Sequence, residues 1–105
     1  MLYYFKVRVE PKDWSFDEMW DWWDKEADAA LAAKASGKMV ALYKVAGQRL
    51  VIGIMDAESH DEMDRIFMAV LPIAHNLEIE EILPVRAYES FASDVKRRWK
   101  PEEKP

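Results

Sequence analysis

A glutamate on the apolar face of a tryptophan-rich helix is the residue of this chain best suited to chemistry. Residues 15–36 fit a helix in which Trp20, Trp22 and Trp23 share one apolar arc. Glu26 falls inside that arc, where a carboxylate must be hydrogen-bonded, paired with a cation or protonated through a raised pKa. Each outcome is also a way to make a general base or acid, so Glu26 is the candidate catalytic residue. The alternative is a structural glutamate that pairs with a buried Arg or Lys.

Other side chains are candidates for binding a substrate. Tyr4 and Lys6 alternate with apolar residues along the first strand, so in a closed barrel they could point into a pocket and bind an anionic group. They could equally face solvent or an interface. Tryptophans suit a core, an interface or a pocket that binds a ring. The candidate substrate-binding residues are Tyr4, Lys6, Trp22, Trp23, Tyr43 and Arg86.

Several classes of site and partner are not expected. The chain has only two histidines, His60 and His75, and no carboxylate spacing that would complete a metal site. It has no glycine-rich phosphate loop, and we expect no cofactor. The net charge of −5 argues against nucleic-acid binding, since the one basic cluster, residues 96–100, fits a solvated helix end. No apolar run approaches a membrane span and there is no cysteine, so the expected location is the cytoplasm.

The elements that must hold Glu26 follow from alternation, capping and turn signals. Ser15 with Glu18, and Ser59 with Glu62, form capping boxes that begin two helices. Pro84 places the last strand at an edge or a bulge. The predicted strands are 2–10, 38–45, 49–55 and 77–85; the predicted helices are 15–36, about 59–71 and about 90–99. Residues 1–100 form a single domain, followed by a charged tail, 101–105.

The order β-α-β-β-α-β is typical of the α+β ferredoxin-like fold, with an extra C-terminal helix here. This plan has a four-stranded antiparallel sheet with both long helices on one face. We expect the other face to carry Tyr4, Lys6, Val51 and Met55. Such a face usually closes against a second subunit, giving a dimeric α/β barrel with an interior pocket. A homodimer or larger homo-oligomer is therefore expected.

Short segments spread along the chain together carry a family resemblance. They are Met1-Leu2-Tyr3 with Lys6 and Val7, Glu26, Gly37, Leu42-Tyr43-Lys44-Val45-Ala46-Gly47, Met55-Asp56, Leu71-Pro72-Ile73, Ile79-Glu80 and Arg86. On these residues the chain resembles the muconolactone delta-isomerase family from residue 1 to about 88. The resemblance implies a cofactor-free isomerase of aromatic catabolism, which shifts a double bond within a lactone bearing a carboxylate. It also implies closed oligomers of α/β-barrel dimers, with Glu26 where the family has its glutamate.

The departures from the family pattern concern polar groups of the pocket. Trp23 stands where the family has a lysine, three positions before the glutamate. Met39-Val40 replaces an aromatic-basic pair, and Arg86-Ala87 replaces a basic-histidine pair. These changes predict a paralogue with the same scaffold and a more apolar pocket, which acts on a substrate other than muconolactone or on none.

Three functional hypotheses follow. The first is a cofactor-free isomerase-like enzyme that shuttles a proton through Glu26 on a small, mostly apolar lactone or carbonyl compound of aromatic catabolism. The second is a non-catalytic dimeric barrel module that binds a hydrophobic small molecule or assists a catabolic enzyme. The third is a cofactor-independent oxygenase of the same barrel type. A pocket with Glu26 beside a cation favours the first, and a pocket filled by the chain's own tryptophans favours the second.

Overall fold

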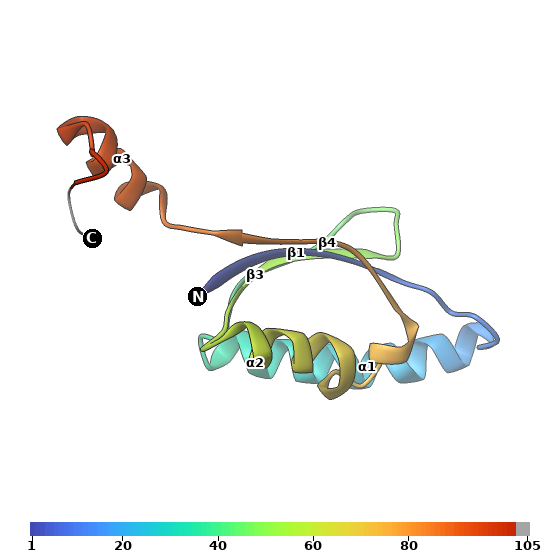
Figure 1. Cartoon of the computed structure of the whole chain (residues 1–105). Coiled ribbons are helices and arrows are strands. Elements are labelled where there is room, and N and C mark those ends of the chain that lie inside the picture. The colour runs from blue at the N-terminus through green and yellow to red at the C-terminus, as the bar shows by residue number, and fades with distance from the viewer. Residues whose placement is uncertain (103–105) are drawn as a thin grey trace.

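The computed structural model describes residues 1–102 and has the predicted order of elements. The strands are β1 (Leu2–Val9), β2 (Met39–Lys44), β3 (Leu50–Asp56) and β4 (Leu77–Val85). The helices are α1 (Phe16–Ala35), α2 (His60–Arg65) and α3 (Tyr88–Arg97), with a π-helix η1 (Ile66–Val70) and a 3-10 turn η2 (Ala74–Asn76) between α2 and β4. The strands form one antiparallel sheet in the order β2-β3-β1-β4. Helices α1 and α2 cover one of its faces (Figure 1), which confirms the ferredoxin-like α+β fold.

The face of the sheet toward the helices, called the inner face here, forms the core. Alternate residues of β1, from Tyr3 to Val9, are buried there as the period of a strand requires. Met55 lies opposite Tyr3, and Val51 lies opposite Val7, so both are on the inner face. The prediction that Val51 and Met55 lie on the uncovered face is therefore wrong. Alternation divides a strand into two faces, but the pairing register decides which face meets the helices.

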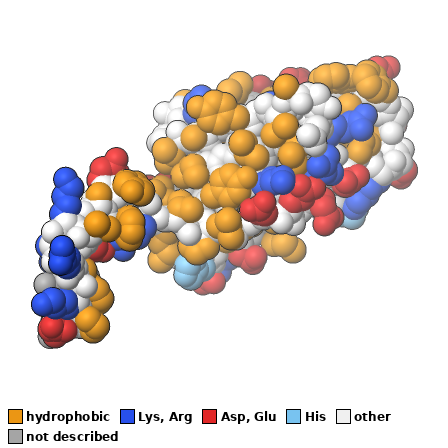
Figure 2. Space-filling view, turned by 90° about the horizontal axis from the view of Figure 1, so that it is seen from above, with side chains coloured by type: hydrophobic (Ala, Val, Ile, Leu, Met, Phe, Trp, Pro, Cys, Tyr) orange, Lys and Arg blue, Asp and Glu red, His pale blue; other side chains and the backbone are white. Residues whose placement is uncertain are grey.

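The other face of the sheet, called the outer face here, is not covered within the chain. Figure 2 views it directly and shows apolar side chains around a band of basic and acidic ones. Arg8 Nε donates to Glu80 at 2.7 Å, and Lys6 Nζ lies 3.7 Å from Glu80 and 3.8 Å from Glu81. The pairing of β1 with β4 shifts between Lys6 and Val7, so a bulge brings both glutamates toward these cations. Lys6, Arg8, Glu80 and Glu81 on the outer face are thus paired with one another.

Helix α3 projects away from the rest of the molecule at the end of β4 (Figure 1). The molecule is accordingly long, with extents of 57 × 27 × 23 Å. A C-terminal helix was predicted over about 90–99, two residues later than observed. Of the predicted charged tail 101–105, residues 101 and 102 form a turn and the remainder lies outside the described residues. Within residues 1–102, no helix is both long and apolar enough to span a membrane.

Candidate functional site

Helix α1 holds Glu26 near its middle and begins at the predicted capping box. The Glu18 amide donates to Ser15 Oγ at 3.1 Å, and the Ser15 amide donates to the Glu18 carboxylate at 3.1 Å. These bonds satisfy two amides that the helix itself leaves free. Among the residues of α1, only Met19 and Glu26 are buried. The prediction that Glu26 lies on the inward side of the helix is confirmed.

A cavity of about 740 Å³ separates α1 from the inner face of the sheet. Its walls are almost entirely apolar, with Phe5 and Val7 from β1, Met55 from β3 and Phe67 from η1. Four of the residues by which α1 lines the space are small: Ala27, Ala29, Ala30 and Ala33. Alanines in these places cannot reach the sheet, and the space that larger side chains would fill therefore stays open. The cavity has the size and lining of a small-molecule site.

Glu26 is the buried acid of this cavity. It is only 9% exposed, and its Oε1 has no hydrogen-bond partner among the described residues. Burial disfavours the charged form and raises the pKa of the Glu26 carboxyl, and a hydrogen bond from the Ile73 backbone amide partly offsets this rise. The Glu26 carboxyl therefore has a hydrogen bond from the Ile73 amide, while its Oε1 has no partner among the described residues. A group of this kind is suited to accept and return a proton.

The segment Leu71-Pro72-Ile73 brings the Ile73 amide to Glu26. The Leu71 amide donates to the Ile66 carbonyl at 3.2 Å, which closes a π-type turn, and Leu71 is extended as expected before a proline. Asn76 then anchors the segment, since its side chain donates to the Glu10 carbonyl at 2.9 Å. Ile73 itself is almost fully buried. Sequence reasoning missed this amide, because only the end of the helix at Pro72 was readable and not the π turn before it.

Trp23 and Tyr43 are the two predicted binding residues that line the cavity. Tyr43 lies on the edge strand β2 opposite Ile52, so its largely exposed side chain is on the outer face and only its edge of the strand borders the cavity. Trp22 does not line the cavity. Its ring stacks on Trp14 with centroids 6.1 Å apart and carries Lys25 Nζ at 4.5 Å from its centroid. The helical wheel gave α1 too wide an apolar arc, because an aromatic ring at its edge can be covered by a loop residue instead of the sheet.

Tyr4, Lys6 and Arg86 do not line the cavity either. Tyr4 and Lys6 are on the outer face of the sheet, opposite Ile54 and Ile52. Arg86 lies beyond β4, where it donates to Asp94 at 2.7 Å. The prediction that Lys6 or Arg86 lies within reach of Glu26 is wrong for the single chain. It assumed a pocket inside a barrel of two sheets, whereas the cavity lies between the sheet and α1.

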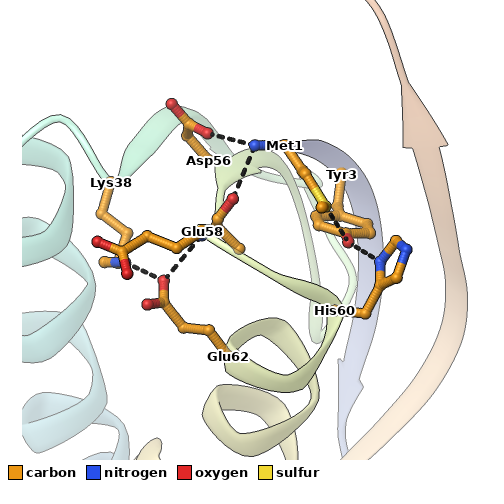
Figure 3. Close-up of polar contacts among 8 residues, drawn as sticks. Met1, Tyr3, Lys38, Asp56, Glu58, His60 and Glu62 are labelled. Atoms are coloured by element: carbon orange, nitrogen blue, oxygen red, sulfur yellow. Dashed lines mark hydrogen bonds and ion pairs between the residues drawn. The ribbon is translucent and has the colours of Figure 1, made fainter.

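The cations that do line the cavity are Lys38 and Lys44, and both have other partners. Lys38 forms an ion pair with Glu62, which also accepts from the Glu58 amide (Figure 3). This pair lowers the pKa of Glu62 and ties the start of α2 to the start of β2. Ser59 caps α2, but the Glu62 side chain bonds to Lys38 and Glu58, so the second capping box is only half formed. Glu26 has no ion pair with any described residue.

A second hollow of about 640 Å³ adjoins the cavity at the N-terminal end of α1. Trp20 and Trp23 line both spaces. Arg49, at the start of β3, lines the second one, and its guanidinium has no ion pair or hydrogen bond with any residue among 1–102. We call this space the vestibule. Arg49 was not a predicted site residue, because a lone arginine after a turn gives no pattern that distinguishes it from a surface residue.

The sequence was compared with family models and with known proteins. The family model described as muconolactone delta-isomerase matches residues 1–91, which include every residue of the cavity. The chain belongs to the muconolactone delta-isomerase family. A crystal structure of muconolactone isomerase is similar in fold, with a TM-score of 0.71 and 22% identity, over 83% of this chain and 90% of that one. None of the curated proteins compared with the chain matches it.

The family match includes Glu26, and the structure shows which side chains surround it. The family match ends within α3, so the last turns of this helix lie beyond it. Trp23, which stands where a lysine was expected, lies one helical turn before Glu26 and makes that part of the wall apolar. The cavity of this family member is therefore lined by aromatic and aliphatic groups, and the unattached cation lies in the vestibule.

Proposed function

We propose that this protein is a cofactor-free, isomerase-like enzyme in which Glu26 moves a proton on a small, mostly apolar lactone or carbonyl compound of aromatic catabolism. The observation that carries the proposal is the unpaired, buried Glu26 carboxyl on the wall of an open apolar cavity. Structural carboxylates at such depth are normally paired or fully hydrogen-bonded. This one is aimed at space that a ligand can occupy.

The reaction that fits is the transfer of one proton between two carbons. Glu26, as carboxylate, removes the acidic proton from the carbon beside a carbonyl, and the electron pair spreads into a dienolate. The neutral Glu26 acid then returns the same proton to a more distant carbon, so the double bond moves and nothing else is consumed. The apolar wall favours the neutral acid, and the Ile73 amide favours the carboxylate. The net effect of the two is a pKa of Glu26 above its ordinary value, which favours return of the proton from the neutral acid.

The vestibule supports a substrate that carries an anionic group at one end. Arg49 is a permanently charged, forked donor whose guanidinium has no partner among residues 1–102, which suits a carboxylate. Trp20 and Trp23 stand between it and the cavity, where an apolar ring can pack on them. We therefore expect an apolar ring near Glu26 with a carboxylate directed toward Arg49. Muconolactone itself is not expected to be the best substrate, because the wall at Trp23 is apolar.

The experiment is proton exchange measured without knowledge of the natural substrate. Purified protein is incubated in D₂O with α-angelica lactone, a small lactone whose double bond can move into conjugation, and deuterium incorporation and isomerisation are followed by NMR. Glu26→Gln is expected to lower the catalysed rate by roughly 10²-fold or more. The matched control is Asp28→Asn, which removes an exposed carboxylate two residues away on the same helix. An unchanged catalysed rate in Glu26→Gln would contradict the proposal that Glu26 transfers the proton.

A second candidate function is ligand binding without catalysis. It is favoured by one observation, that neither lysine of the cavity is free to stabilise a dienolate oxygen, since both have other partners. The tryptophans line one end of the cavity but leave it open, so ligand binding is expected under either hypothesis. Saturable binding of an unsaturated lactone with no exchange above the uncatalysed rate would favour this second function.

We also propose a homodimer that closes the outer face of the sheet. Large apolar side chains are exposed there, and the charged residues among them are paired with each other. An exposed sheet face of this kind is typical of subunit interfaces. Light scattering at micromolar concentration tests it, and a stable monomer would contradict it.

A further inference from the structure

Helix α3 has an apolar stripe that no residue of the sheet, α1 or α2 covers. At 100° per residue, Tyr88, Phe91 and Val95 fall on one side of the helix, and every one of them is exposed. An amphipathic helix of this length is not stable in water by itself, because its stability comes mainly from burial of the apolar side. The stripe therefore requires a partner.

The chain's own body is not that partner. Strand β4 carries α3 away from the layers formed by the sheet, α1 and α2 (Figure 1). Arg86, two residues before the helix, bonds Asp94 at 2.7 Å and lies 5.4 Å from the centre of the Phe91 ring, so it packs on α3 itself. The stripe of α3 is thus open to another molecule.

The cavity has an apolar rim that matches the stripe. Among the residues lining the cavity, the large exposed ones on the inner side of the sheet are Trp20 and Leu31 of α1, 56% and 61% exposed. Leu42 and Lys44, on the inner side of the edge strand β2, also line the cavity, so its mouth opens between α1 and β2. Phe16 extends the row one turn further along α1 and contacts the Trp20 ring edge to face. A helix laid along this row would close the mouth.

The charges agree with this match and disfavour the alternative. The exposed side of α1 carries Asp21, Asp24 and Asp28, none of which has an ion pair among the described residues. The end of α3 carries Lys96, Arg98 and Lys100, which are also exposed. Opposite charges therefore face each other when the stripe lies on α1. On the outer face of the sheet, by contrast, Glu80 and Glu81 already have basic partners within the chain.

We propose that α3 of a second copy of this chain docks along α1 and the edge of β2 and closes the mouth of the cavity that contains Glu26. The stripe covers the apolar rim, and the basic end of α3 meets the aspartates of α1. The open cavity of one chain is then an incomplete site, and the partner's α3 excludes water from it. The ligand role of the cavity rests on the proposed function, but the docking itself does not.

The test uses the absence of cysteine in the chain. Two full-length chains with different tags are prepared, one with Leu31→Cys on the rim and one with Val95→Cys on the stripe, and they are mixed, refolded together and oxidised mildly. A disulfide-linked pair that contains both tags is expected. The matched control replaces the rim cysteine by Ile54→Cys, which lies on the outer face of the sheet opposite Tyr4. Each chain is also oxidised alone to measure random pairing.

Three outcomes decide the proposal. A mixed product with Leu31→Cys that exceeds the product with Ile54→Cys, and that is lost when Phe91→Asp is added to the α3 chain, supports it. A stronger product with Ile54→Cys shows that α3 docks on the sheet and overturns it. No mixed product above random pairing overturns it as well. No substrate is present in this test, so its result does not depend on proton transfer by Glu26. The docking proposal and the proton-shuttle proposal can therefore be contradicted separately.

Discussion

Two carboxylates on opposite sides of the sheet, Glu80 on the outer face and Glu26 on α1 at the inner side, have pKa values shifted in opposite directions. On the outer face, hydrogen bonding from Arg8 lowers the pKa of Glu80, and Lys6 adds a smaller contribution. On the inner side, burial raises the pKa of Glu26, which has no cation to offset the loss of water. An exposed, paired carboxylate of the first kind contributes little to stability and marks structure. A buried, unpaired one of the second kind is costly to keep, and it is therefore the better candidate for function.

The sharpest way to break this comparison is to remove each carboxyl in turn. Glu26→Gln is expected to lower proton exchange by roughly 10²-fold or more, since the amide cannot accept the proton. Glu80→Gln, the same change on the outer face, is expected to leave the exchange rate unaltered. NMR-detected exchange on both variants checks this. Equal losses would mean that the site extends through the sheet and that the two faces are not functionally distinct.

Filling the cavity around Glu26 is expected to have the next largest effect, a loss of ligand affinity. Ala30→Phe places a ring in the cavity from α1 and is expected to weaken binding of an apolar lactone by about tenfold or more, as the ring takes the ligand's place. Stability should change little, because the ring enters existing space. The control is Ala41→Phe on β2, which is opposite Ile54 and so lies on the outer face. Calorimetric titration measures both. Unchanged binding in Ala30→Phe would place the ligand elsewhere.

The sequence predicted the fold well because the signals for it are local. Strand alternation, the Ser15–Glu18 box and the glycine-containing turn before β3 each act within a few residues, and β4 was placed at its observed bounds, Leu77–Val85. Glu26 was found by the same local means, since one helical wheel separates it from its charged neighbours. The family resemblance added the expected identity of the scaffold, and the match over residues 1–91 confirms it.

The surroundings of Glu26 were predicted poorly because they depend on contacts between distant segments. The wheel could not show that alanines on α1 leave a cavity instead of a packed layer. Lys6 was expected near Glu26, yet the pairing register places it on the other side of the sheet. The position of the Ile73 amide depends on a π turn that no residue pattern predicted. Arg86 was expected at the pocket, yet its partners Asp94 and Phe91 lie in α3.

Substrate choice should follow the apolar wall at Trp23. Muconolactone is expected to be converted slowly or not at all, because Trp23, Met39 and Ala87 stand where the family resemblance leads us to expect polar groups. Trp23→Lys restores a cation one turn before Glu26 and is expected to raise muconolactone conversion relative to the unaltered protein. Ultraviolet absorbance follows the reaction. Rapid conversion by the unaltered protein would show that these three positions do not set specificity.

The smallest effect concerns stability and pH, and it tests directly whether Glu26 is unpaired. Below the ordinary pKa of a glutamate both folded and unfolded chains hold the proton, so the unaltered protein and the Glu26→Gln variant should be equally stable. As pH rises, the unfolded chain loses its proton first, because burial raises the pKa of Glu26 only in the folded state. The stability of the unaltered protein should therefore fall relative to Glu26→Gln between that ordinary pKa and the raised one.

Urea unfolding at pH 4 and pH 8, at one fixed protein concentration, measures this difference. Glu26→Gln is expected to be the more stable protein at pH 8, with the gap closing at pH 4. A structural glutamate paired with a buried cation would give the opposite sign, since its removal leaves that cation alone at a cost of about 3 kcal/mol or more. A loss of that size at pH 8 would mean that a cation reaches Glu26 in the assembled protein. The inner carboxyl would then resemble Glu80, and the contrast between the two faces would disappear.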